Sequence, residues 1–367
     1  MDKHLVGQWY KEEMGETLNI FDETPLRMKM SFTSSGYYNF EPNCVYEKDD
    51  YLCFEINDEI YRMVYHIKFV KDHLEGYYTQ HGKDTPVRYV LVSGEPKDEP
   101  YEFIPTVKYI PETKEKRIDL LKKYAMYSKV PTKPYTTEYV LGGKIPKILS
   151  KYGFSEYIGE IDITADAVVF KILDFVCDHF GHNGSGGVCS GRKIEDIIKF
   201  CEKKDGKTNC RGLAILLASL LRLVSVKARH ITCMPYEHPF EDCHVVVDCL
   251  MPSGKRIMLD PTFRLFYKDS EGEYISLERL RKILIADQPI FPNPNASYNG
   301  GEFDSESNRD YMIKNTFRFS RGTYYENGSD EYAVRRVELV PANYPVEKFT
   351  DSMKQELVYD EVEFWKM

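Results

Sequence analysis

The chain has 367 residues, of which 42% are hydrophobic and 29% charged, and its formal net charge is −9. This composition is typical of a soluble globular protein with enough apolar residues for a sizeable core, and the length predicts two domains. Acidic and basic residues are interleaved along the chain, which argues against nucleic acid as a partner because a nucleic-acid-binding protein carries a basic face.

Membrane and secretion signals are not apparent. No window approaches the roughly 18 uninterrupted apolar residues that a membrane span needs, so we expect no membrane partner. The opening residues, MDKHLVGQWYKEE, lack the apolar segment of a secretory signal. The nine cysteines are odd in number and widely spread, which is more typical of a reducing compartment than of a disulfide framework. These features predict a cytoplasmic protein and leave its oligomeric state open.

Residues 1–97 predict strand after strand. Segments rich in β-branched and aromatic residues, such as YLCFEIND (51–58) and HLEGYYTQ (73–80), alternate with short polar turns. Short connections predict an antiparallel meander, and a meander of seven or eight strands avoids open edges by closing into a barrel. The opening LVGQWY resembles the Gly-x-Trp start of lipocalin-like barrels. Two alternatives follow: a barrel with a filled core and Trp9 at its base, or a barrel that binds a ligand.

A Pro- and charge-rich break, SGEPKDEPYEFIP, predicts a domain boundary near residues 94–106. Beyond it, the spacing of apolar residues predicts amphipathic helices at 112–129, 164–180 and 192–206. We therefore expect the barrel in residues 1–97, a linker and helical connection in 98–150, and a larger second domain in 151–367.

Cys210 stands at the start of a leucine-rich segment, KTNCRGLAILLASLLR (207–222). Thr208 or Asn209 can cap a helix here, because their side-chain oxygens accept hydrogen bonds from the free N–H groups of the first turn. Spacings of three and four then predict a buried helix with Leu213, Leu216, Leu217, Leu220, Leu221 and Val224 on its apolar side. A cysteine in the first turn lies at the positive end of the helix dipole, which lowers its thiol pKa and suits a nucleophile.

A cysteine nucleophile needs a base, and the base needs an orienting group. CHVVVDCL (243–250) predicts a strand that carries His244, MPSGK predicts a tight turn, and RIMLD predicts a returning strand that ends at Asp260. With a two-residue turn, Asp260 lies opposite residue 245 or 247 and is a near or diagonal neighbour of His244. A one-residue irregularity would bring His244 and Asp260 face to face.

These segments resemble the transglutaminase-like superfamily. The similarity covers residues 207–263 and follows the family's order of cysteine helix, Ala-Arg strand, histidine strand and LDPT. It implies an α+β, papain-like core, in which the helix carrying the cysteine packs on an antiparallel sheet. It also implies a catalytic triad in which Cys210 attacks an amide carbonyl, His244 accepts and returns the proton, and Asp260 orients the histidine. The implied activity is acyl transfer through a thioester on a protein or peptide substrate, with no cofactor.

The chain departs from transglutaminases proper at several positions. Arg211 follows the cysteine where those enzymes carry an aromatic residue, and Val245 and Val246 follow the histidine. The only tryptophans, Trp9 and Trp365, lie outside the matching region, whereas tryptophans roof the glutamine tunnel of transglutaminases. These differences favour hydrolysis, as in a peptidase or amidase, over protein cross-linking.

Three questions stay open. The reaction needs an oxyanion donor besides the Cys210 N–H, and Asn183 and Asn209 are candidates. Zinc binding is a rival role for the Cys and His residues between His230 and Cys249, but the spacings of structural zinc sites are absent, so we expect no metal.

The alternative function is a non-catalytic binding protein, with the barrel as ligand module and the second domain as scaffold.

A long Pro-, Asn- and Gly-rich segment, DQPIFPNPNASYNGGEFDSES, occupies residues 287–307 and predicts a loop. Loops of this length are uncommon in compact domains unless they are functional or mobile. We expect this loop to border the active-site cleft and to limit access to it.

Overall fold

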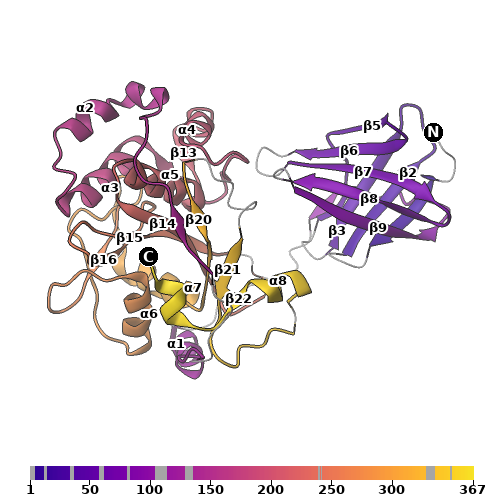
Figure 1. Ribbon diagram of the computed structural model, residues 1–367. Helices are drawn as coiled ribbons and strands as arrows, with labels where there is room; N and C mark the ends of the chain where they lie inside the picture. The colour runs from indigo at the N-terminus through magenta and orange to yellow at the C-terminus, as the bar shows by residue number, and fades with distance from the viewer. Residues whose placement is uncertain are drawn as a thin grey trace. The chain divides into compact units, whose positions relative to one another are not determined.

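The computed structural model describes residues 5–11, 15–33, 37–57, 62–80, 83–103, 114–128, 135–238, 240, 242–327, 335–347 and 349–367. The chain divides into two compact units, Met1–Ile110 and Pro111–Met367 (Figure 1). The segment predicted as a connection, residues 98–150, is shared between them. No helix among the described residues is both long enough and apolar enough to cross a membrane.

The first unit is a curled antiparallel sheet. Within the described residues nine strands form a meander and a short tenth pairs with the fourth; they are β1 (Gly7–Lys11), β2 (Glu16–Phe21), β3 (Arg27–Phe32), β4 (Tyr37–Phe40), β5 (Cys44–Lys48), β6 (Tyr51–Asn57), β7 (Arg62–Val70), β8 (His73–Gln80), β9 (Lys83–Ser93) and β10 (Glu102–Phe103). Strand β1 pairs with both β2 and β9, so the sheet turns back on itself. No pairing joins β4 to β5 in the described part of the chain, so the predicted barrel is a partly closed sheet.

Alternate side chains of these strands form the core of the first unit, as the period of two in a strand requires. Trp9 is fully buried, and its indole Nε1 donates to the Leu5 carbonyl at 2.9 Å. Phe54 and Tyr65 belong to the same core, and their rings stack with centroids 4.5 Å apart. This packing agrees with the filled-core alternative.

The second unit is built on a six-stranded sheet (Figure 1). Its strands lie in the order β16 (Arg256–Leu259), β15 (His244–Leu250), β14 (Lys227–Met234), β19 (Arg318–Gly322), β21 (Arg336–Leu339) and β22 (Leu357–Val358). Neighbours are antiparallel except β21 and β22. Along β15, Val245 and Val247 enter one hydrophobic core and Val246 enters the other. The sheet is therefore buried on both faces, and the α+β class predicted from the sequence is confirmed.

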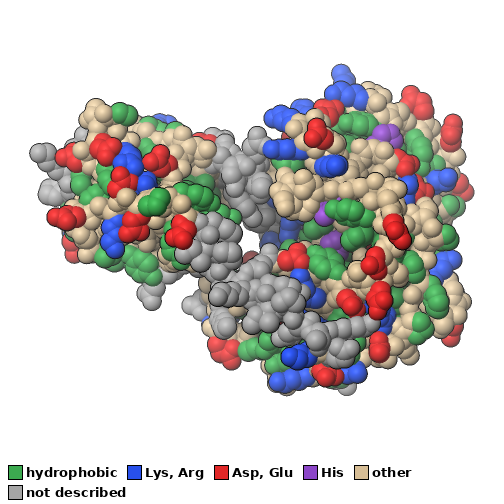
Figure 2. Space-filling model, turned by 180° about the vertical axis from the view of Figure 1, so that it is seen from behind, with side chains coloured by type: hydrophobic (Ala, Val, Ile, Leu, Met, Phe, Trp, Pro, Cys, Tyr) green, Lys and Arg blue, Asp and Glu red, His purple; other side chains and the backbone are tan. Residues whose placement is uncertain are grey.

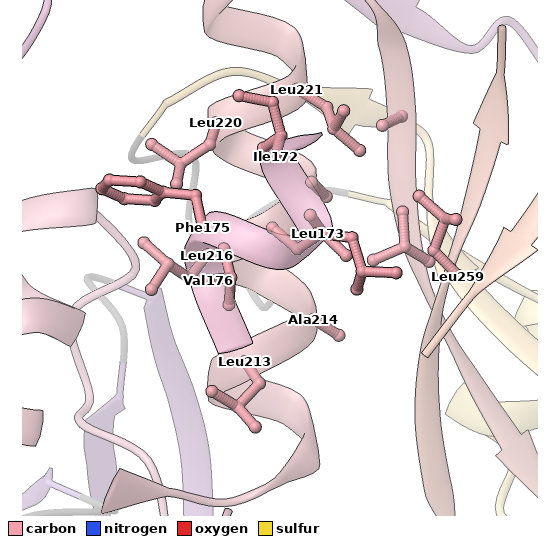
Figure 3. Packing of buried hydrophobic residues seen from close by; sticks show 14 of the residues in the cluster. Ile172, Leu173, Phe175, Val176, Leu213, Ala214, Leu216, Leu220, Leu221 and Leu259 are labelled. Carbon is pink, nitrogen blue, oxygen red and sulfur yellow. The ribbon is translucent and has the colours of Figure 1, made fainter. Parts of the chain in front are cut away.

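One face of this sheet is covered by the helices that the leucine and isoleucine spacing predicted: α3 (Ala167–His179), α4 (Ile194–Glu202) and α5 (Cys210–Leu223). Helix α5 is buried from Gly212 to Leu223 and packs on β14 and β15. Helix α3 packs against α5, and Figure 3 shows Ile172 and Val176 among the leucines of α5. This packing fixes the first turn of α5, where Cys210 lies.

The other face is covered by α1 (Lys114–Lys123), α6 (Leu277–Ile285), α7 (Ser305–Asn315) and α9 (Glu361–Trp365). Helix α7 was not predicted, since it begins inside the segment assigned to a loop. It buries only two apolar residues, Met312 and Ile313, which is too few for an apolar period. Its start is nevertheless defined, because the Asp304 side chain accepts from two N–H groups of its first turn.

Shorter elements complete the second unit: a 3-10 helix (Lys147–Tyr152), α2 (Phe154–Gly159), α8 (Asp351–Glu356), and three pairs of short strands, β11 (Glu138–Tyr139) with β20 (Tyr324–Tyr325), β12 (Gly181–His182) with β13 (Lys207–Thr208), and β17 (Tyr267–Lys268) with β18 (Phe291–Pro292). All nine cysteines are free of disulfides. On the face in view in Figure 2, acidic and basic side chains are interspersed over both units.

Candidate active site

Cys210 is the first residue of α5, as the sequence predicted. Asn209 caps this helix, and its side-chain oxygen accepts from the Gly212 N–H at 3.0 Å. The Thr208 hydroxyl instead donates to the Gly187 carbonyl at 2.9 Å. Strand β13, which pairs with β12, ends at the residue before this cap. The Cys210 sulfur therefore lies at the junction of a paired strand and a buried helix.

The environment of Cys210 favours its thiolate. Burial alone would raise the pKa of the thiol, but hydrogen bonds with His182 and His244 and the charges of His244 and Arg211 outweigh burial and lower it to about 6. Burial instead raises the pKa of Cys177 to about 12 and that of Cys243 to about 11. Among the described cysteines whose pKa is shifted, Cys210 is the one shifted downward.

His244 and Asp260 are in contact. His244 is the first residue of β15, and its Nε2 lies 2.6 Å from Asp260 Oδ2. Burial alone would lower the pKa of His244, but the charge and hydrogen bond of Asp260, together with the Cys210 thiolate, raise it to about 10. The geometry therefore favours an imidazolium between a thiolate and a carboxylate.

The hairpin that joins His244 to Asp260 differs by one residue from the prediction. Val247 pairs with Leu259, so the turn contains three residues, 252–254, rather than two. Continuing this register places Asp260 opposite the residue two positions after His244 on the same strand. Side chains two positions apart share a face of a sheet, so Asp260 and His244 point to the same side.

A cavity of about 650 Å³ opens over Cys210 and His244. One wall is aromatic: the Phe263 ring lies 5.6 Å from that of Tyr298 and 5.9 Å from that of Phe303, measured between centroids. Tyr298 and Phe303 come from the segment 287–307, so this segment lines the cavity, as expected from the sequence.

The residues at which the chain differs from transglutaminases proper lie in different parts of the structure. Arg211 and Val245 line the cavity, and the Arg211 guanidinium donates to the Thr232 hydroxyl at 3.2 Å. Trp9 lies in the core of the first unit. Trp365 lies in the second unit, in the core between the sheet and helices α1, α6, α7 and α9. Neither tryptophan is among the described residues that line the cavity.

A second histidine, His182, also reaches the cavity and hydrogen-bonds Cys210. The sequence analysis did not select His182, which lies in the Gly-rich segment FGHNGSGG (180–187). Strand β12 pairs in parallel with β13 and places His182 opposite Thr208, close to the cysteine. The only sequence signal was a histidine in a Gly-rich segment, since strands of two residues leave no periodic pattern.

Of the two oxyanion candidates chosen from the sequence, Asn209 lines the cavity. The Asn209 side-chain oxygen is engaged in capping α5. The Asn183 side-chain oxygen accepts from the Ser185 N–H at 3.2 Å, and Asn183 is not among the described residues that line the cavity.

Residues 156–261 match the family model of the transglutaminase-like superfamily, and this range includes Cys210, His244 and Asp260. No curated protein matches the chain. Two solved structures are similar to it: a "putative protease" from Parabacteroides distasonis ATCC 8503, with 13% identity, TM-score 0.24, and 56% of this chain and 40% of that chain covered, and a "putative cysteine protease" from Cytophaga hutchinsonii, with 14% identity, TM-score 0.26, and 77% and 82% covered. The family match confirms the resemblance seen in the sequence: residues 156–261 form a transglutaminase-like domain.

Proposed function

We propose that this protein is a cysteine hydrolase that cleaves an amide bond of a protein or peptide through a thioester intermediate. The main support is the chain of contacts from Cys210 through His244 to Asp260. His244 Nε2 lies 2.6 Å from Asp260, so the hydrogen bond of His244 with the sulfur is left to Nδ1. This order of thiolate, imidazolium and carboxylate is what nucleophilic catalysis by cysteine requires.

The acylation step follows from this order. The Cys210 sulfur attacks the carbonyl carbon, a C–S bond forms, and the carbonyl π electrons move to oxygen. As the intermediate collapses, the C–N bond breaks and the proton on His244 Nδ1 passes to the leaving amine. Asp260 keeps the imidazole oriented and stabilises its charged form.

In deacylation His244 acts as a general base, whereas in acylation it acts as a general acid. His244 takes a proton from water while the water oxygen attacks the thioester carbonyl. The C–S bond then breaks, the carboxylic acid leaves, and the thiolate and imidazolium are restored. The histidine therefore ends each cycle with the proton that it held at the start.

The cavity supports a peptide substrate. A volume of about 650 Å³ lies within the usual range of ligand sites, roughly 300–1,000 Å³. The aromatic wall of Phe263, Tyr298 and Phe303 suits an apolar side chain next to the scissile bond. Arg211 beside the cysteine, in place of an aromatic residue, supports water rather than a protein amine as the acyl acceptor.

Casein incubated with a fluorescent primary amine tests this proposal. Hydrolysis predicts new amino termini or released ammonia without incorporation of the amine, and Cys210→Ala should abolish the product. Incorporation of the amine would instead assign the chain to the transferases. Absence of any product with casein and with a proteome-derived peptide library, for parent and variant alike, would contradict an enzymatic function.

A further inference from the structure

His182 is held close to the reacting sulfur by its own strand. It lies opposite Thr208 in the β12–β13 pair, and the next residue, Asn183, donates its N–H to the Thr208 carbonyl at 2.8 Å. Thr208 is two residues before Cys210. The backbone of β12 is thus hydrogen-bonded to β13, the strand that precedes Cys210.

The two ring nitrogens of His182 have separate partners. Nδ1 lies 3.1 Å from the Tyr298 hydroxyl. Nε2 is therefore left for the Cys210 sulfur, which lines the same cavity and whose pKa His182 lowers. When the Tyr298 hydroxyl donates to Nδ1, the imidazole carries its proton on Nε2 and presents an N–H donor to the thiolate.

Asn299, the residue after Tyr298, clamps the backbone of His182. Its side-chain oxygen accepts from the His182 N–H at 2.7 Å, and its Nδ2 donates to the His182 carbonyl at 3.0 Å. Gly181 leaves room for this approach, because a Cβ there would lie only 3.1 Å from the Asn299 oxygen. Two neighbouring residues of the 287–307 segment therefore fix both the backbone and the ring of His182.

We infer that His182 is a second catalytic histidine, whose Nε2–H holds the Cys210 thiolate in the free protein and the oxyanion during acyl transfer. Tyr298 and Asn299 are its positioning residues. This inference rests on the proposed cysteine chemistry and supplies the oxyanion donor that the sequence left open.

The geometry of attack supports this role. When the sulfur bonds to the carbonyl carbon, the developing oxyanion is only two bonds from that sulfur. A donor already aimed at the thiolate needs only a small shift to reach the oxyanion, and the Cys210 backbone N–H provides the other donor. The proton stays on His182 Nε2 throughout, and the proton that reaches the leaving group comes from His244.

Two reagents separate this role from a structural one. Iodoacetamide alkylates the thiolate by displacing iodide and forms no oxyanion. 4-Nitrophenyl acetate acylates the same sulfur through a tetrahedral oxyanion and releases nitrophenolate. Both rates are measured against pH on the full chain by mass spectrometry of the Cys210 peptide, with Cys210→Ala as the blank.

For His182→Ala we expect the acid limb of both profiles to move to higher pH. On the alkaline plateau, where the sulfur is ionised in all variants, alkylation should be nearly unchanged while acylation falls about 100-fold or more. His182→Gln, which restores an N–H donor, should recover much of the acylation rate. Tyr298→Phe should shift the acid limb in the same direction by a smaller amount.

The inference is overturned if His182→Ala leaves both profiles unchanged, or if it slows both plateau rates equally. Should His182→Ala fail to fold, Tyr298→Phe decides, and unchanged profiles in that variant overturn the inference. In each case the proposed function stands if His244→Ala still suppresses both reactions. If Cys210 of the parent protein reacts no faster than the exposed Cys44, the proposed function and the inference fall together.

Discussion

Asp260 Oδ2 lies 2.6 Å from His244 Nε2, and the two side chains are exposed by only 1% and 2%. A buried carboxylate this close to an imidazole favours the charged ring, and it also fixes which nitrogen is turned toward Cys210. The reactivity of the sulfur therefore depends on a residue that does not itself line the cavity.

Asp260→Asn tests this dependence, because the amide keeps the size of the side chain and removes its charge. Although burial lowers the pKa of His244, Asp260 helps to raise it to about 10, so the alkaline limb of the pH–rate profile should move to lower pH. We expect kcat to fall on the order of 10²- to 10⁴-fold.

Asp248→Asn is the matched control, since Asp248 is a buried carboxylate on the same hairpin that pairs with Arg229 and Arg256. It should lower the melting temperature and leave the alkaline limb in place. An unchanged limb in Asp260→Asn would mean that Asp260 does not act through His244.

His244→Gln should raise the pKa of Cys210. In the native protein burial raises this pKa, and the hydrogen bonds and charges that lower it to about 6 include those of His244. The rate of alkylation by iodoacetamide at neutral pH should fall accordingly. His230→Gln, at a buried position on β14 outside the cavity, should leave the rate unchanged. Equal rates in the two variants would argue against a contact between His244 and the sulfur.

The pH dependence of kcat/KM should be bell-shaped. The thiolate forms as pH rises through about 6, the lowered pKa of Cys210, and the imidazolium is lost as pH rises through about 10, the raised pKa of His244. These values belong to the coupled pair rather than to either residue alone. A single acid limb near the ordinary thiol pKa would contradict the predicted ion pair.

Asn209→Ala should destabilise α5 at its first turn. The Asn209 side chain caps this helix by accepting from the Gly212 N–H, and loss of such a cap costs about 1 kcal/mol. Asn209→Ser keeps a capping oxygen and should lose only part of this free energy. Urea titration measures both values, and equal losses would show that the cap contributes little.

The site was predictable where a pattern is local. The cap at Asn209, the leucine spacing behind Cys210 and the strand–turn–strand pattern around His244 are each contained in a short segment. Whether Asp260 faces His244 depends on one residue in the turn, and MPSGK is compatible with a two- or a three-residue turn. His182 was not predictable, because its position depends on a pairing between two strands of two residues each.

In the fold, too, local patterns were predictable and pairings between distant segments were not. Strands β15 and β16 follow one another in the chain, and their pattern predicted a hairpin, while the Ala-Arg strand β14 and the antiparallel sheet were implied by the family resemblance. Strand β19 lies next to β14 in space but far from it in sequence, with Met234 paired to Arg318. No local pattern encodes that pairing. In the first unit the predicted meander gave neighbouring strands correctly, but it did not predict that β4 and β5 are unpaired within the described residues.

The most direct measurement is the alkylation of all nine cysteines of the native protein by iodoacetamide at neutral pH, followed by mass spectrometry. Cys210 should be labelled first, ahead of the exposed Cys44, and its rate should follow an acid limb near pH 6. Labelling of Cys44 before Cys210, or a Cys210 rate that rises only near the ordinary thiol pKa, would contradict an activated nucleophile and with it the proposed hydrolase.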